Sequence, residues 1–196
     1  MTITLSRITQ ISRTKIGAEY PSSGSTTFST PGAGTWTVPS GATTMTIELW
    51  GGGGGGFYGN MSGDGWGGGG GAYASKTLAV TAGAVINFTV GAGGQGYTVF
   101  PFPLSPSTNG TASTYDSVIA GGGQASGLGG VATGGDVNIS GGAGTVPLGG
   151  TAGGPGGGTS DQPPGGGGSG GVYTGGLLSE VSGSNGQNGR VVIAWS

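Results

Sequence analysis

Blocks of consecutive glycine constrain this chain more than any other feature. The clearest are Gly51–Gly56, Gly67–Gly71, Gly121–Gly123, Gly156–Gly158 and Gly165–Gly168. Glycine inside a helix or strand costs about 0.5–1 kcal/mol relative to alanine, and it has no side chain to bury. The regular alternative is the polyproline-II helix, with three residues per turn, which packs closely side by side only where side chains are absent. The blocks therefore predict a lattice of hydrogen-bonded polyglycine-II helices.

Such a lattice needs an anchor. Each backbone hydrogen bond contributes about 0.5–1.5 kcal/mol, whereas ordering one backbone residue costs about 1–2 kcal/mol. The stretch TTMTIELW alternates strictly, with Met45, Ile47 and Leu49 on one face, as expected of a half-buried strand. We also expect strands within 26–44 and at 72–80, 85–90, 111–119 and 190–195. The predicted fold is an all-β base that carries a polyglycine-II lattice, with essentially no α-helix.

The charge and composition exclude several classes of function. The net charge is −2, charged residues are only 6%, and the chain has no cysteine and no histidine. Phosphate contacts need clustered lysine and arginine, so we expect no binding to nucleic acid. No apolar run is long enough to span a bilayer, so we expect no membrane insertion. We expect no enzymatic activity, cofactor or metal, and we interpret Asp64 and Asp136 as turn residues rather than calcium ligands.

Residues 1–25 differ from the glycine-rich remainder at 26–196. They combine apolar and basic side chains without a clear helical or strand period. We interpret this segment as one that becomes ordered when it attaches to a partner; the alternative is a disordered tail. The candidate attachment residues are Ile3, Leu5, Ile8, Ile11, Arg13 and Lys15.

Three loops within the glycine-rich region carry large side chains, at 57–66, 97–108 and 172–178. Tyrosine and tryptophan often anchor recognition sites, and the prolines in the second loop lower the cost of ordering it. These loops therefore form a candidate binding surface. The alternative is that they form small satellite cores. The candidate binding residues are Phe57, Tyr58, Asn60, Trp66, Tyr97, Phe100, Phe102, Tyr173, Leu177 and Leu178.

Three sequence blocks carry a family resemblance. They are FSTPGAGTWTVPSGATTMTIELWGGGGGG, GGAYASKTLAVTAGAVINFTVGAGG and the C-terminal GRVVIAW. In this order they resemble the glycine-rich domain of bacteriophage tail-fibre tips and minor tail proteins, over nearly the whole chain from Thr26 to Trp195. The glycine pattern is also similar to that of the receptor-binding adhesins of T-even-like phages, in which stacked polyglycine-II helices present variable loops to host receptors.

The resemblance implies a virion protein, made in the host cytoplasm and assembled into the phage tail. The leading hypothesis is a tail-fibre or tail-tip adhesin that recognises a protein or glycan receptor on the outer surface of the host. Its other partners would be tail or fibre proteins, bound through residues 1–25. One alternative is a structural minor virion protein without a receptor role. Another is an ice-binding protein, because polyproline-II bundles can present flat faces of small side chains.

Overall fold

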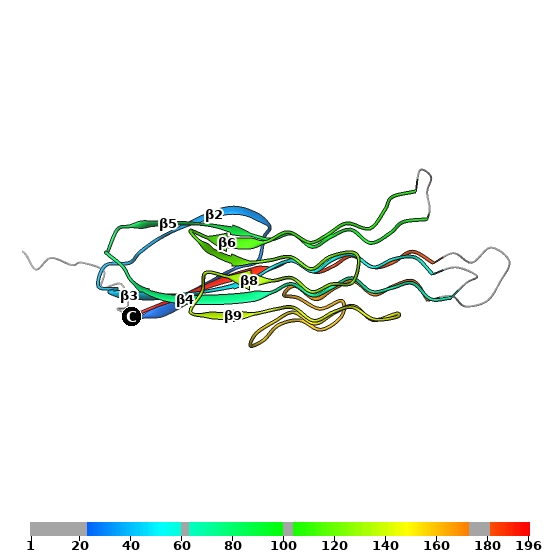
Figure 1. The fold of residues 1–196 in the computed structure, drawn as a ribbon. Coiled ribbons are helices and arrows are strands. Elements are labelled where there is room, and N and C mark those ends of the chain that lie inside the picture. Colours follow the sequence, from blue (N-terminus) through cyan, green and yellow to red (C-terminus); the bar gives the residue numbers. More distant parts are fainter. Residues whose placement is uncertain (1–22, 60–62, 100–103, 173–180) are drawn as a thin grey trace, which may run out of the picture.

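The fold is elongated, with a β-sandwich at one end and a bundle of extended segments that runs away from it (Figure 1). The computed structural model describes residues 23–59, 63–99, 104–172 and 181–196. Within these ranges all regular structure is β-strand and none is helix, which confirms the predicted all-β class. We call the extended glycine-rich segments rods, and the end of the bundle opposite the sandwich the distal end.

The sandwich consists of two five-stranded antiparallel sheets. The first sheet has the order β1 (Gly24–Phe28), β10 (Arg190–Trp195), β3 (Thr44–Trp50), β4 (Tyr73–Ala79) and β9 (Val137–Ile139). The second has the order β2 (Gly32–Thr37), β5 (Val85–Val90), β6 (Ser113–Tyr115), β7 (Val118–Ala120) and β8 (Ala132–Thr133). The chain that leaves β3 for the lattice therefore returns to β4, its neighbour in the first sheet.

The hydrophobic core lies between the two sheets and follows the alternation seen in the sequence. Met45, Ile47 and Leu49 of β3 are each fully buried, together with Ile193 of β10. Burying one such side chain stabilises the fold by about 1.5–3 kcal/mol. Ring contacts between the sheets complete the core, with centroids 4.6 Å apart for Phe28 and Phe88 and 5.2 Å apart for Trp36 and Trp195.

Three details of the strands differ from the sequence-based expectation. The single strand expected at 111–119 is a hairpin of β6 and β7, because Asp116 turns the chain with a φ of 48°. Strands β8 and β9 were not expected, since glycine and small polar residues surround them and they are only two and three residues long. Strand β1 begins at Gly24, so the last two residues of the 1–25 segment lie in the sandwich.

Gly51–Gly56 forms the central rod and directly continues β3. Its backbone N–H groups repeat their partners every three residues, which is the period of a three-residue-per-turn helix. Gly51 and Gly54 donate to the carbonyls of Ala72 and Gly69. Gly52 and Gly55 donate to those of Thr111 and Thr108. Gly53 and Gly56 donate to those of Gln187 and Ser184. Its carbonyls accept bonds from three further segments, through the N–H groups of Gly94 and Tyr97, Gly123, and Gly168. The rod is therefore surrounded by neighbours, as in a polyglycine-II lattice.

Gly67–Gly71 forms a second rod, antiparallel to the first, that leads back into β4. Its N–H groups show the same period, since Gly67 and Gly70 donate to the segment 142–145 while Gly68 and Gly71 donate to 165–168. The two rods form a hairpin, closed at its distal end by the bond of 2.7 Å from Phe57 N–H to the Trp66 carbonyl.

Close approach explains why these rods are glycine. None of the glycines in the two rods has a φ in the left-handed region, so conformational freedom is not the reason. A Cβ placed on Gly54 would lie 2.5 Å from the carbonyl carbon and oxygen of Gln124, and 2.9 Å from the Ala125 nitrogen. These are backbone atoms of the next rod, so no side-chain movement could relieve the overlap.

Side chains extend the lattice at its outer layer. The rod at 91–99 lies beside the chain at 182–188, and every third N–H group donates to a side-chain oxygen there. Gly93, Gly96 and Val99 donate to Asn188 Oδ1, Asn185 Oδ1 and Ser182 Oγ over 3.0, 2.7 and 3.2 Å. On the other side, Ala92 and Gln95 donate to the hydroxyls of Thr111 and Thr108 over 2.7 and 2.8 Å. Polar residues spaced by three thus substitute for backbone carbonyls.

Candidate binding surface at the distal end

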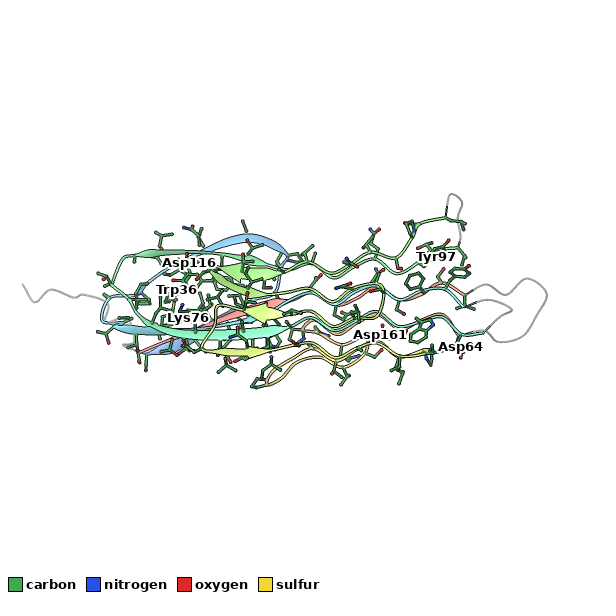
Figure 2. The ribbon with its side chains drawn as sticks, viewed as in Figure 1. Trp36, Asp64, Lys76, Tyr97, Asp116 and Asp161 are labelled. Carbon is green, nitrogen blue, oxygen red and sulfur yellow. The ribbon has the colours of Figure 1, made fainter. Side chains whose placement is uncertain are left out.

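The described parts of the three candidate loops lie together at the distal end. In Figure 2, Asp64 and Tyr97 are both at this end, whereas Trp36, Lys76 and Asp116 are in the sandwich. The first loop is joined to the chain that follows the third loop by a bridge in which Gly59 and Val181 exchange bonds of 2.9 and 3.1 Å. The second loop is joined to the same following segment by the bond of 3.0 Å from Gly183 N–H to the Tyr97 carbonyl. One rigid lattice therefore presents all three.

Part of this surface is packed internally. The rings of Tyr58 and Tyr97 contact each other with centroids 4.5 Å apart, and both residues are half-buried. Val99 is 3% exposed, and its N–H group bonds Ser182. Such internal packing is what the satellite-core interpretation of the loops expects, and the binding roles of Tyr58 and Tyr97 stay predictions.

Other large side chains at this end face solvent. Phe57 is 37% exposed and Trp66 is 59% exposed, although they lie on adjacent rods that bury their glycines completely. Leu104 and Val172 are exposed as well. An exposed tryptophan on a rigid backbone is available for contact without any rearrangement.

Phe57 and Trp66 line an open groove with Ser126, and its volume is about 340 Å³. Ser126 lies in the turn that ends the rod beginning at Gly121. That turn is closed by a bond of 2.8 Å from Gln124 N–H to the Leu128 carbonyl. Sequence reasoning missed Ser126, because nothing in GGQASGLGG distinguishes it from other small polar residues in the chain.

The described part of the distal surface carries almost no charge. Of its described segments, at 57–59, 63–66, 97–99, 104–105, 171–172 and 181–183, only one carries a charged side chain, Asp64. The basic residues Lys76 and Arg190 belong to strands of the sandwich, where the Arg190 guanidinium lies 4.4 Å from the Trp50 ring centroid. This surface therefore favours neutral ligands.

Two further observations concern the chemistry of the described residues. In the ranges that the structure covers, no three acidic, cysteine or histidine side chains gather as they would around a metal ion. Nor do these ranges contain a helix with the length and hydropathy needed to cross a membrane. Asp136 accepts a bond of 2.8 Å from Thr77 N–H, and Asp161 accepts one of 3.0 Å from Ser169 N–H. Both carboxylates thus bind backbone.

Several candidate residues lie outside the described part of the chain. For the binding surface these are Asn60, Phe100, Phe102, Tyr173, Leu177 and Leu178. For the attachment segment they are Ile3, Leu5, Ile8, Ile11, Arg13 and Lys15. Their roles stay predictions, as do the binding roles of Phe57, Tyr58, Trp66 and Tyr97.

A comparison with protein families identifies the class of protein that this fold represents. The model of the family described as glycine-rich domain matches residues 26–145, which is more than half of the chain. The chain belongs to this family. A comparison with curated proteins finds no match. The family match ends before 165–168 and 184–187, yet both segments bond to the central rod, so the lattice extends beyond the matched region.

Proposed function

We propose that the protein is an adhesin of a bacteriophage tail fibre or tail tip, and that its distal end recognises the outer surface of the host. The observation that carries the proposal is the exposure of Phe57 and Trp66 at the distal end, where the described parts of the other two loops also lie. The sandwich anchors the lattice at its opposite end. The sequence resemblance to phage tail-fibre domains supplies the biological setting. Recognition sites are commonly built from such exposed aromatic anchors on rigid supports.

The architecture suits this role physically. The rods place the distal surface away from the sandwich, and the described chain begins at β1 within that sandwich. A protein that attaches through residues 1–22 would therefore present its distal end outward. The dense backbone hydrogen bonding of the rods holds the described residues of that end in place before contact, which lowers the entropic cost of binding.

The test is adsorption of the fluorescently labelled full chain to a panel of bacterial strains. Substituting Trp66, Phe100 or Phe102 by alanine should weaken adsorption to the recognised strain at least tenfold, equivalent to about 1.4 kcal/mol or more. The melting temperature should change little. The matched control is Val85→Ala, because Val85 is 57% exposed but lies on β5 in the sandwich. If the loop variants unfold while adsorption per folded molecule stays intact, these aromatics are satellite core.

A structural minor virion protein without a receptor role is the second candidate. The observation that favours it is the lattice itself, in which every backbone N–H group of Gly51–Gly56 and Gly67–Gly71 already has an acceptor within the protein. Gold labelling of this chain on intact phage particles distinguishes the two. Label at the outer tip of the tail or fibre supports the adhesin, whereas label along a shaft or at an internal joint supports the structural protein.

A further inference from the structure

The groove lined by Phe57, Trp66 and Ser126 has the construction of a small-ligand site. Its two aromatic walls come from neighbouring rods, because Phe57 N–H bonds the Trp66 carbonyl over 2.7 Å and so pairs the two residues. The glycines on either side, Gly56 and Gly67, are buried in the lattice. The groove is open to solvent and its volume is about 340 Å³, so it would hold a small ligand against one face rather than enclose it.

The third wall supplies neutral hydrogen-bonding groups. The Ser126 hydroxyl lies 3.2 Å from Gln124 Oε1, so a polar pair stands at the edge of the apolar walls. The turn that carries it is held by the bond of 3.0 Å from Gly127 N–H to the Gln124 carbonyl. No charged side chain is among the described residues that line the groove. An anionic or cationic ligand would therefore meet no counter-charge on these walls.

One class of ligand matches both properties. A neutral pyranose has an apolar face of C–H groups and a rim of hydroxyls. The C–H groups carry a small positive charge and are attracted to the negative face of an aromatic ring, while the rim needs neutral donors and acceptors. We infer that this groove binds a neutral hexose unit of a surface glycan, stacked on Trp66 or Phe57 and hydrogen-bonded at Ser126. This inference rests on the proposed function, for which it names the ligand class.

The groove is open to solvent, so a sugar within a longer chain could enter without its ends being enclosed. A flat protein partner would instead need a contact area several times larger than this groove provides. A protein receptor is thus a separate outcome of the test.

The test uses the full chain with ¹⁵N-labelled tryptophan indoles, titrated with methyl glucopyranoside, galactopyranoside and mannopyranoside, and with maltose and lactose. Four indole signals are expected, one for each tryptophan. At least one sugar should shift the Trp66 signal, and the shift should saturate at concentrations up to about 10 mM. This range detects dissociation constants up to about 10 mM. The other three signals report whether the fold is intact.

Variants separate stacking from general stability. Phe57→Ala and Ser126→Ala should each weaken binding, with Phe57→Ala reducing affinity at least about tenfold. In variants that lack the Trp66 indole, binding is measured by broadening of the NMR signals of the sugar. By this measurement Trp66→Tyr should retain binding, whereas Trp66→Ala should lose it. Val85→Ala should behave as the unmodified chain. If none of these sugars shifts the Trp66 signal, the glycan inference is wrong.

Adsorption to cells distinguishes that result from failure of the adhesin proposal. If Trp66→Ala abolishes adsorption while no sugar binds, and protease treatment of the cells removes the receptor, the adhesin proposal stands with a protein receptor. If neither sugars nor cells are bound, both proposals fail. If periodate oxidation of cell-surface glycans and the Trp66→Ala substitution each abolish adsorption, and sugars bind, both proposals hold.

Discussion

At the scale of single residues, Ser113 connects the sandwich to the lattice. It is fully buried, and its hydroxyl donates to the Trp50 carbonyl over 2.6 Å while accepting from Gly91 N–H over 2.8 Å. Trp50 ends β3, and Gly91 follows the last residue of β5. One hydroxyl therefore binds the chain at two of the points where a strand continues as a rod.

Substituting Ser113 by alanine should destabilise the protein by about 1–3 kcal/mol, because a buried carbonyl and a buried N–H group both lose their partner. Denaturant unfolding measures the change. The matched control is Ser140→Ala, at an exposed serine after β9, where we expect less than about 0.5 kcal/mol. Equal losses at the two positions would show that the Ser113 bonds contribute nothing specific.

Tyr73 should make stability depend on alkaline pH. Burial raises the pKa of its phenol above 10.0, and the nearby Glu48 carboxylate, which accepts its hydrogen bond over 2.7 Å, adds to this. Above pH 10 the unfolded chain therefore loses this proton first and binds fewer protons than the native state. The free energy of unfolding consequently falls as the pH rises through the native pKa.

The Tyr73→Phe variant should show a smaller alkaline fall in its unfolding midpoint, measured between about pH 8 and pH 11. A residual fall is expected from Tyr115, whose pKa burial also raises. No histidine is present to contribute a transition near neutral pH. An unchanged alkaline fall in the variant would assign the effect to other groups.

At the scale of elements, the outer rod depends on side chains spaced by three. Asn185→Ala removes the acceptor of Gly96 N–H, so we expect a loss of about 1 kcal/mol in unfolding free energy. Hydrogen exchange of the Gly96 amide should rise in the same variant. Gln187→Ala is the control, since Gln187 belongs to the same segment but bonds the central rod through its backbone carbonyl. Matching exchange rates at Gly96 in both variants would rule out the side-chain contribution.

The sequence predicted the elements that rest on local pattern. Strict alternation located β3, and the apolar runs located β5 and β10 at their observed bounds. It could not locate β9, which is exposed throughout and owes its pairing to β4, nor the turn at Asp116. A run of glycines does not specify which residues of two rods pair. The neighbours of each rod are therefore known only from the hydrogen bonds of the folded lattice.

The candidate surface was likewise only partly predictable from the sequence. The glycine blocks on both sides of 57–66 predicted polyglycine-II helices, and the bonds from Gly54 to Gly69 and from Phe57 to Trp66 join these two rods as a hairpin. Ser126 joins the groove only because the rod at 121–125 packs beside both of these rods. Such proximity has no signature in the sequence.

At the scale of the whole molecule, the sandwich contributes the apolar burial that the lattice lacks. Each rod residue gains at most two backbone hydrogen bonds, which roughly offset the cost of ordering it. The lattice should therefore unfold together with the sandwich or before it, and its distal end should remain ordered only while strands such as β3 and β4 hold the base of each rod.

The N-terminal boundary of the folded domain can be tested by deletion. Removing residues 1–22 should change the unfolding free energy by less than about 0.5 kcal/mol, because β1 begins at Gly24 and packs against Trp195. Removing residues 1–28 takes away β1 and the ring of Phe28 that contacts Phe88, so a loss above about 3 kcal/mol is expected from lost burial and lost strand pairing.

Incorporation of the shorter deletion into phage particles tests attachment separately from folding. If residues 1–22 attach the protein to its fibre or tail, the shorter deletion should stay folded, keep the Trp66 indole signal and bind cells as a free protein. It should nevertheless be missing from purified particles, because it would lack the segment that attaches it. Incorporation of this deletion at the level of the unmodified chain would place the attachment surface on the sandwich, and loss of its fold would make residues 1–22 part of the core structure.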